Sequence, residues 1–275
     1  MRIVIALGGN ALLHRGQRPD PGLERANVVR VATAIAPLAH EHDLVLTHGN
    51  EPQLGRLAAE ETAGPAALDL LGAQTQGLIG SLLVCTLRDV LPGRRVAAVL
   101  THTLVRADDP AFARPSAPVG RHAVPSPRPE RILEADTVRA LLDLGTVAVC
   151  AGGGGIPVVT DGTGALRGVP AVVDKDLAAA VLAEELKADF LLLLTDVPNV
   201  YVGFGTPRQR PLLDATPAEL RRGHYPAATM GPKAEAAARF VERTGGLAAI
   251  GHLDAAHEIV HARSGTLVRP ELPGV

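Results

Sequence analysis

The chain has 275 residues, of which 47% are hydrophobic and 20% charged, a composition typical of a globular protein with a substantial core. Its 27 basic and 29 acidic residues give a net charge of −2, so the overall charge favours neither nucleic acid nor an anionic membrane as partner. Aromatic residues make up 2% and Trp is absent, which argues against the stacking platforms of single-strand-binding proteins.

The sequence shows no clear signal peptide, membrane span or disulfide pattern. The apolar start at 2–7 is too short for a signal peptide, and no apolar run approaches the roughly 18 residues of a membrane span. Cys85 and Cys150 lie in apolar segments, where we expect small, buried and reduced side chains. We therefore expect a cytoplasmic protein.

Strand-like and helix-like segments alternate along the chain. Near-continuous apolar strands separated by helices are typical of a mainly parallel open sheet covered on both faces, so the sequence predicts an α/β fold. We expect strands at 2–7, 43–48, 95–101, 146–151, 169–173, 189–195 and 247–251, with long helices at 24–39 and 70–90.

Two segments interrupt this alternation. Residues 107–129 hold six prolines, a density that excludes a regular helix or a central strand and predicts an ordered excursion from the sheet. Residues 197–211 form a second irregular stretch, rich in Gly and Pro.

Lysine is rare in this chain. Only three of the 27 basic residues are lysines, namely Lys175, Lys187 and Lys233, and Arg is used everywhere else. Asp174 can cap a helix that begins at Lys175, and Pro232 suits the first turn of a helix containing Lys233. A helix N-terminus already favours an anion, and a compact ammonium adds a full charge there. We infer that Lys175 and Lys233 are functional, whereas Lys187 follows a plain helical run.

Glycine-rich turns follow three of the predicted strands, at 6–10, 47–52 and 151–157. Ligands of open α/β sheets gather at the carboxyl ends of the strands, and glycines let backbone amides approach an anion closely. Together the turns predict a backbone cradle for a phosphate-like group. His48 lies within the second turn, where it could line the site or bind a backbone carbonyl.

Common nucleotide and metal motifs do not explain the chain. It contains neither a Walker A sequence nor a Gly-rich fingerprint that opens a helix with an acid following at the expected distance. The sequence from His257 to His261 matches the H-E-x-x-H zinc motif, but it lies near the end of the sequence, with little chain after it for a third ligand. We interpret it as an amphipathic surface helix with solvated histidines.

Seven motifs together resemble those of the carbamate kinases of the amino-acid-kinase fold. They are ALGGNALLHRG, LTHGNEPQLG, AQTQGLIGSLL, AGGGGIPVV, DKDLAAAVLAEEL, LLLTDVPNVY and ATMGPKAEAA, and they span nearly the whole chain. The resemblance implies a three-layer α/β/α sandwich in one domain, with an acceptor lobe at 1–165 and a nucleotide lobe at 166–275. It also implies a homodimer and reversible transfer of a phosphoryl group between carbamoyl phosphate and ADP, giving ATP and carbamate.

The resemblance also implies roles for individual residues. Lys175 and Lys233 would neutralise the moving phosphoryl group, Asp176 would orient both lysines, and Mg²⁺ would bridge the phosphates of ATP or ADP. The residues that would bind the acceptor and the phosphate are Gly8, Gly9, Asn10, Gly49, Asn50, Gly153 and Gly154. Those that would bind the nucleotide are Thr195, Asp196, Val197, Tyr201 and Met230.

The acceptor side departs from the family pattern. The protruding subdomain of the family is reduced to the Pro-rich stub at 107–129, and its lysine is replaced by Ala117, unless a nearby arginine takes over its charge. Glu51 stands where the family has a Gly, and it could point away from the site, weaken carbamate binding or help select another acceptor. The candidate arginines are Arg15, Arg121 and Arg128.

Two alternatives to an active carbamate kinase therefore stay open. One is a kinase of the same fold that acts on a different small acid or amide. The other is a nucleotide- or carbamoyl-phosphate-binding protein with little turnover, against which the two retained lysines count.

Overall fold

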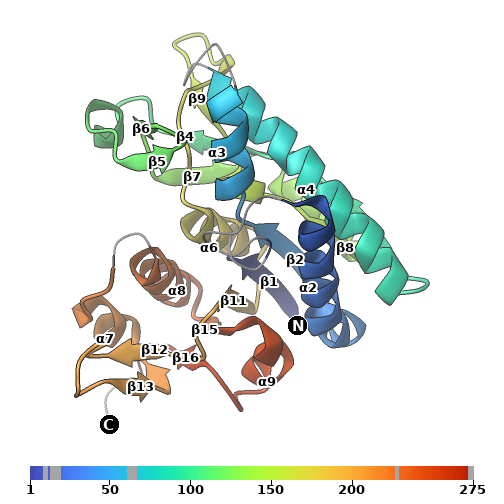
Figure 1. Cartoon of the computed structure of the whole chain (residues 1–275), viewed down its shortest axis with the longest axis vertical. Helices are drawn as coiled ribbons and strands as arrows, with labels where there is room; N and C mark the ends of the chain where they lie inside the picture. The colour runs from blue at the N-terminus through green and yellow to red at the C-terminus, as the bar shows by residue number, and fades with distance from the viewer. Residues whose placement is uncertain (9–11, 13–19, 61–66, 227–228, 272–275) are drawn as a thin grey trace.

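A single large sheet forms the centre of the molecule (Figure 1). The computed structural model describes residues 1–8, 12, 20–60, 67–226 and 229–271. In these residues the large sheet has the strand order β14-β16-β15-β11-β1-β2-β8-β3, and all neighbours pair in parallel except β15 and β16. The strands are β1 (Arg2–Leu7), β2 (Asp43–His48), β3 (Arg95–Ala98), β8 (Thr146–Val149), β11 (Phe190–Thr195), β14 (Asp214–Ala215), β15 (Leu247–His252) and β16 (Thr266–Val268).

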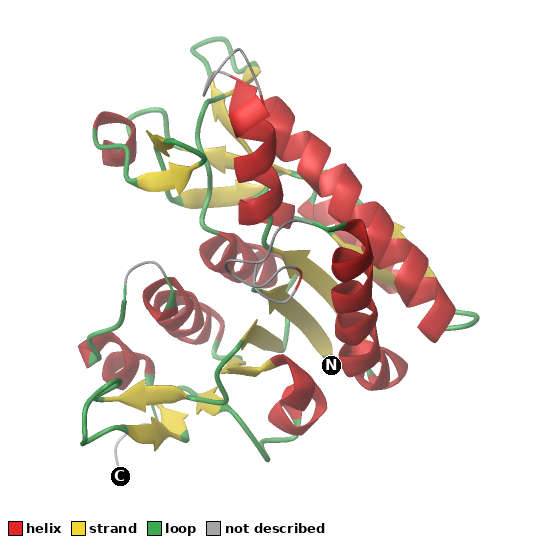
Figure 2. Cartoon of the chain, in the orientation of Figure 1, coloured by secondary structure: helices red, strands yellow, loops and turns green. Residues whose placement is uncertain are grey.

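Helices cover both faces of this sheet, which confirms the predicted three-layer α/β/α architecture (Figure 2). Successive side chains of a strand point to opposite faces, and β1 shows the consequence: Ile3 and Ile5 belong to one apolar cluster, Val4 and Ala6 to the other. Helices α2 (Pro21–Glu41), α4 (Leu68–Val90) and α9 (Ala256–Val260) contribute to the first cluster, and α5 (Ala135–Asp143), α6 (Lys175–Glu185), α7 (Pro217–Arg222) and α8 (Met230–Thr244) to the second.

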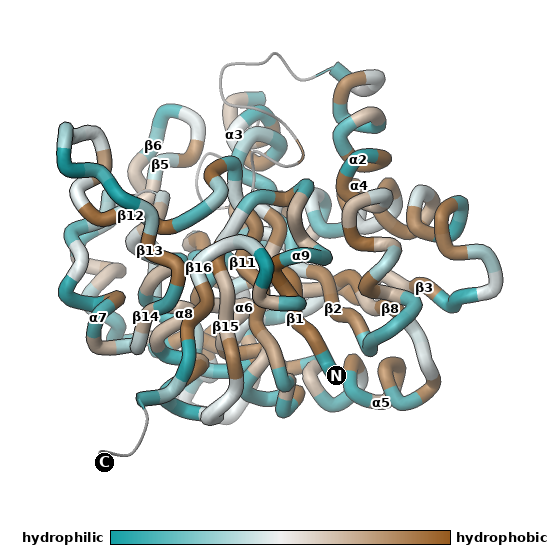
Figure 3. Tube along the Cα trace, turned by 90° about the horizontal axis from the view of Figure 1, so that it is seen from below, coloured by the Kyte–Doolittle hydropathy of each residue, from teal (hydrophilic) through white to brown (hydrophobic). Residues whose placement is uncertain are grey.

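The central strands are apolar throughout because both of their faces are buried. Figure 3 shows β1 and β2 in the hydrophobic colour, while hydrophilic segments lie mainly in the outer helices and loops. The three six-residue central strands thus contribute Ile, Val and Leu side chains to both apolar clusters, and the helices contribute further Ala, Val and Leu residues.

A smaller sheet is formed within residues 102–168, in the order β10-β9-β4-β7. Its strands are β4 (His102–Val105), β7 (Pro129–Ile132), β9 (Ile156–Thr160) and β10 (Leu166–Gly168). The Pro-rich stub at 107–129 holds a 3₁₀ turn, η2 (Pro110–Ala113), and a hairpin of β5 (Ala117–Val119) and β6 (His122–Val124), ending as β7 begins. The stub is thus an ordered excursion, as predicted.

The stub packs against α3 (Glu51–Glu60), the helix that begins directly after β2 and its turn. Val119 and Val124 share an apolar cluster with Leu54 of α3, and the backbone N–H of Val172 donates to the carbonyl oxygen of Pro125 at 3.0 Å. These contacts attach the stub to the two segments that lead into the functional site.

Three predicted strands need correction. No strand covers 169–173, where Pro170 has no N–H and neighbouring N–H groups donate to scattered acceptors such as Pro157 and Pro125. The predicted strand at 95–101 ends at Ala98, before β4 begins in the other sheet, and the one at 146–151 ends at Val149. The irregular stretch at 197–211 contains a short hairpin, β12 (Val200–Val202) with β13 (Arg210–Leu212).

Helix α4 has a buried face and an exposed one. Cys85, predicted to be buried, is exposed, because it lies seven residues, about two turns, after the exposed Leu78, whereas Leu83 and Leu87 face the sheet. Among the described helices α4 alone is long and apolar enough to cross a membrane, with 39% of its most apolar window buried. Core helices of soluble proteins meet the same criterion, and α4 packs on α2 and β3.

Candidate functional site

The ends of parallel strands bring the predicted site residues to one edge of the sheet. β1 leads to Gly8, β2 to Gly49 and Asn50, β8 to the four-glycine turn, and β11 to Asp196. This is the edge at which open α/β sheets bind their ligands. Gly9, Asn10 and Arg15 lie outside the described residues.

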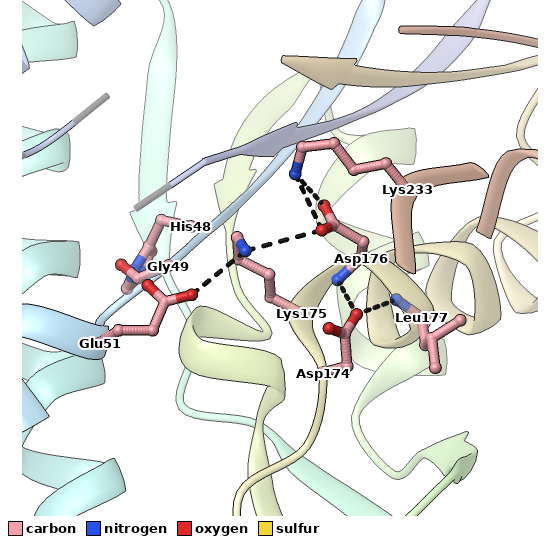
Figure 4. A network of polar contacts seen from close by, with 8 residues as sticks. All are labelled: His48, Gly49, Glu51, Asp174, Lys175, Asp176, Leu177 and Lys233. Atoms are coloured by element: carbon pink, nitrogen blue, oxygen red, sulfur yellow. Dashed lines mark hydrogen bonds and ion pairs between the residues drawn. The ribbon is translucent and has the colours of Figure 1, made fainter. Parts of the chain in front are cut away.

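Two lysines meet a single buried carboxylate at this edge (Figure 4). The Nζ of Lys233 donates to both oxygens of Asp176, at 3.1 and 2.9 Å, and the Nζ of Lys175 lies 3.6 Å from Oδ2 of Asp176. Only 2% of the Asp176 side chain is exposed. The structure thus brings together the three residues that the family resemblance named as catalytic.

Local sequence signals position this cluster. Asp174 is the N-cap of α6, and its Oδ1 accepts hydrogen bonds from the backbone N–H groups of Asp176 and Leu177, at 2.9 and 3.0 Å. The cap places Lys175 at the first residue of α6. Lys233 is the fourth residue of α8, and Pro232 is the third, within the first turn as predicted.

Mutual attraction sets the ionisation of the cluster. Burial alone would raise the pKa of Asp176, but the charges of Lys175 and Lys233 hold it below its usual range. Burial would likewise lower the pKa of Lys175, yet the carboxylates of Asp176, Glu51 and Asp174 raise it above its usual value. Burial and the nearby Asp176 charge raise the pKa of Asp174. Lys175 is therefore protonated and Asp176 ionised at neutral pH.

Glu51 points into the site. Its Oε1 accepts a hydrogen bond from the Nζ of Lys175 at 3.2 Å, so the interpretation in which this side chain turns away is wrong. Neighbouring groups partly desolvate the carboxyl of Glu51, which works against its ionisation, but the Lys175 charge lowers its pKa. Since 60% of the Glu51 side chain is exposed, the carboxylate lies at the solvent side of Lys175 and Asp176 at its buried side.

The four-glycine turn packs tightly against the turn after β2. Gly153 has a positive φ of 63°, and a Cβ on it would lie 2.2 Å from Nδ2 of Asn50. A Cβ on Gly154 would lie 2.2 Å from the carbonyl oxygen of Val173, in the segment before α6. Glycine is thus required here for close packing between the turns, which places Gly153 beside Asn50.

Polar residues that were not predicted hold these turns in place. The Nδ2 of Asn50 donates to Oγ1 of Thr75 at 2.7 Å, and this hydroxyl donates to the carbonyl oxygen of Gly72. The Oγ1 of Thr103 donates to the carbonyl oxygen of Gly154 at 2.6 Å. Thr75 lies in the Gln-Thr-Gln sequence within the apolar helix α4, a signal that could have identified it.

His48 contacts a backbone carbonyl, which was one of the two possibilities that the sequence allowed. Its Nδ1 lies 3.1 Å from the Gly49 carbonyl oxygen and therefore carries the proton, and its ring lines a cavity of about 150 Å³ beside Gly152 and Cys150. Burial lowers the pKa of His48 to about 4 and raises that of the Cys150 thiol to about 12. A neutral imidazole and a neutral thiol make this cavity a poor anion site.

The predicted nucleotide residues lie at the end of β11, in β12 and at the start of α8. Thr195 ends β11, and its Oγ1 donates to Oδ1 of Asp196 at 3.2 Å. Val197 and Tyr201 are half-buried on the segment that continues into β12, and Met230 is the half-buried first residue of α8. Figure 1 shows β12 and α8 on the same side of the molecule, away from the stub.

The stub supplies no observed replacement for the missing lysine. Ala117 is the first residue of β5, and Arg121 is exposed at the turn of its hairpin. Arg128 is also exposed, and its backbone N–H donates to Asp109 within the stub.

Comparison with known proteins gives consistent matches over the whole chain. The model of the amino acid kinase family matches residues 1–251. The carbamate kinase of Rhizobium meliloti is 43% identical over 98% of this chain and 93% of its own length, and that of Pyrococcus furiosus is 38% identical over 98% and 99%. The structure of carbamate kinase from Giardia lamblia bound to AMP-PNP has a TM-score of 0.93 and 33% identity, covering 98% of both chains.

The shared carboxylate provides the first prediction. Asp176→Asn removes the anion between two ammonium groups, so we expect the free energy of unfolding to fall by about 3–5 kcal/mol in urea titrations at neutral pH. Because the lysines lower the pKa of Asp176 on folding, its stabilisation is present above about pH 4 and disappears as the pH falls further.

The control for this prediction is Asp136→Asn, which alters an exposed ion pair with Arg139 and should change stability by no more than about 1 kcal/mol. Equal stability of Asp176→Asn and the wild type at neutral pH would contradict the expected role of Asp176.

Proposed function

The chain belongs to the amino acid kinase family and, within it, to the carbamate kinases, and from this premise we propose that it transfers a phosphoryl group reversibly between carbamoyl phosphate and ADP. The products are ATP and carbamate. One observation carries the proposal at the level of the site: two ammonium groups converge on one buried carboxylate at the ligand-binding edge of the sheet.

Phosphoryl transfer requires positioning and charge stabilisation more than covalent chemistry by the protein. In the proposed mechanism Lys175 and Lys233 neutralise the charge that spreads over the equatorial oxygens of the transferring phosphoryl group. Asp176 holds both Nζ atoms in place without competing for the substrate, because it lies on their buried side. Preorganised charges of this kind need no rearrangement when the reaction occurs.

In this proposal the two substrates bind on either side of the lysines. Gly8, Gly49, Asn50, Gly153 and Gly154 fit the acceptor and phosphate side, which belongs to the lobe at 1–165. The segments after β11 and around α8 fit the nucleotide side in the lobe at 166–275, and a relative of known structure binds AMP-PNP. The nucleotide residues in this proposal are Thr195, Asp196, Val197, Tyr201 and Met230.

Magnesium would accompany the nucleotide. Asp176 is engaged by the lysines and Asp174 by the N-cap of α6, so these buried carboxylates do not form a protein cage for a cation. This donor set fits Mg²⁺ that is held mainly through phosphate oxygens, as is common for this ion. When bound, the ion neutralises phosphate charge.

A homodimer in the cytoplasm completes the proposal. The outer face of α4 carries the exposed Leu70 and Leu78, and the exposed Leu100 borders a cavity that α4 also lines. A patch of this kind fits an interface between two copies. Two unpaired cysteines agree with a reducing compartment.

The lysines provide the decisive test of the activity. We expect Lys175→Ala and Lys233→Ala each to lower the rate of ATP formation from carbamoyl phosphate and MgADP by about 10²–10³-fold or more, in a coupled ATP assay. Lys187→Ala, at an exposed position, is the matched control and should keep the wild-type rate. If the purified wild type forms no ATP although it binds nucleotide, the protein is the binding module with little turnover.

A second candidate function rests on Glu51. Its carboxylate occupies the solvent side of Lys175, where an anionic acceptor would approach, and Ala117 leaves the stub without the family's lysine. A kinase of the same fold that acts on another small acid or amide would use this altered acceptor side.

The substitution Glu51→Gly separates the two functions. If Glu51 competes with carbamoyl phosphate, its removal should lower KM severalfold, the effect expected from an exposed ion pair worth about 0.2–1 kcal/mol. Glu60→Gly, at the far end of the same helix, is the control. If Glu51 selects another acceptor, a panel of small acyl phosphates will include one for which Glu51→Gly lowers kcat/KM; unchanged ratios across the panel would exclude that role.

Introducing negative charge into the proposed interface tests the dimer. Leu78→Glu combined with Leu100→Glu should convert the sedimentation profile from dimer to monomer, because two desolvated carboxylates would face the partner. Leu213→Glu changes a leucine in the other lobe that is more exposed than either of these two, and it should leave the profile unchanged. A wild type that sediments as a monomer at micromolar concentration would refute the interface.

A further inference from the structure

A cluster of metal-binding side chains lies where α9 meets the end of α2, outside the catalytic site. Glu41 is the last residue of α2, and His257 and His261 lie on and directly after α9. The Nε2 of His257 is 3.3 Å from Oε1 of Glu41, and the Nε2 of His261 is 3.7 Å from Oε2. Together the three side chains place ligand atoms within 4.8 Å of one another.

These separations fit a single metal ion. Zinc binds nitrogen and oxygen ligands at about 2.0–2.2 Å, so two ligands of a tetrahedral ion lie roughly 3.3–3.6 Å apart. The observed separations from Glu41 to the two imidazoles fall close to this range without a change of backbone. The two rings lie side by side, with centroids 4.4 Å apart.

The hydrogen bonding of His261 prepares it as a ligand. Its Nδ1 donates to the carbonyl oxygen of His257 at 2.8 Å, which fixes the proton on Nδ1 and leaves the lone pair of Nε2 directed toward Glu41. Metal-bound histidines usually donate their second N–H to a carbonyl or carboxylate in this way.

The cluster lies at the opposite edge of the sheet from the lysines. Glu41 precedes Asp43, the first residue of β2, whereas the catalytic edge follows His48, the last residue. Six residues of strand separate the two edges by roughly 16 Å. The third ligand, Glu41, comes from α2 and thus from a part of the chain far upstream of the H-E-x-x-H motif.

We propose that Glu41, His257 and His261 form a binding site for a borderline divalent metal ion such as Zn²⁺, which fastens α9 to the end of α2. Imidazole and carboxylate ligands suit this class of ion, and three protein ligands leave a position for water. A bidentate ion pair between Arg30 of α2 and Asp254, just before α9, already links these two parts of the chain. The metal would be a second link between them. The site takes no part in phosphoryl transfer.

The test uses the full chain without a histidine tag, stripped with a chelator and titrated with Zn²⁺ by calorimetry. We expect one equivalent to bind with micromolar or tighter affinity and to raise the melting temperature. His257→Ala, His261→Ala and Glu41→Gln should each weaken binding about tenfold or more. Co²⁺ should give a visible spectrum that Zn²⁺ abolishes and Mg²⁺ does not.

The matched control is His40→Ala, an exposed histidine one residue before Glu41 on the same helix. It should bind Zn²⁺ as the wild type does. The proposal is overturned if the wild type shows no saturable site at micromolar Zn²⁺, or if the three ligand variants bind as tightly as His40→Ala. Kinase activity of the metal-free variants at the wild-type level confirms that they are folded.

Discussion

The buried carboxylate of Asp176 is the interaction on which the rest of the site depends. A carboxylate with 2% of its side chain exposed is stable only if cations compensate it, and Lys233 and Lys175 both do so. The lysines come from α8 and α6, which pack against each other through alanine-rich surfaces. Small side chains allow the two helix starts to approach closely enough for one carboxylate to bridge both ammonium groups. The core packing and the site chemistry therefore constrain the same two helices.

Much of this arrangement could be predicted from the sequence because its signals are local. Apolar runs predicted the central strands, and the scarcity of lysine singled out Lys175 and Lys233. The errors lie where distant parts of the chain decide the outcome. Residues 169–173 have strand-like composition, but Pro170 and separate acceptors prevent a ladder. The direction of Glu51 and the partner of Asn50 in α4 depend on packing between segments that the sequence does not place side by side.

Glu51 and the Pro-rich stub belong to one connected unit of the structure. Glu51 begins α3, and the shortened stub packs on the same helix through Val119 and Val124. A hydrogen bond from Val172 to Pro125 then ties the stub to the segment that ends at the N-cap of α6. The Pro-rich stub and the Glu51 carboxylate thus act on one helix, so changes to one are expected to affect the other.

The charges around Lys175 explain why substrate binding and the position of Glu51 must be coupled. Two ammonium groups face the three acidic side chains of Asp174, Asp176 and Glu51, so the resting site carries no excess of positive charge. Asp176 is fixed by buried hydrogen bonds and Asp174 by the N-cap of α6, whereas Glu51 is on the solvent side. An anionic substrate that contacts Lys175 must therefore displace Glu51 or share the ammonium with it. Displacing Glu51 costs little free energy because its carboxylate then enters water. The displacement also leaves the ammonium of Lys175 free to compensate the charge of a transferring phosphoryl group.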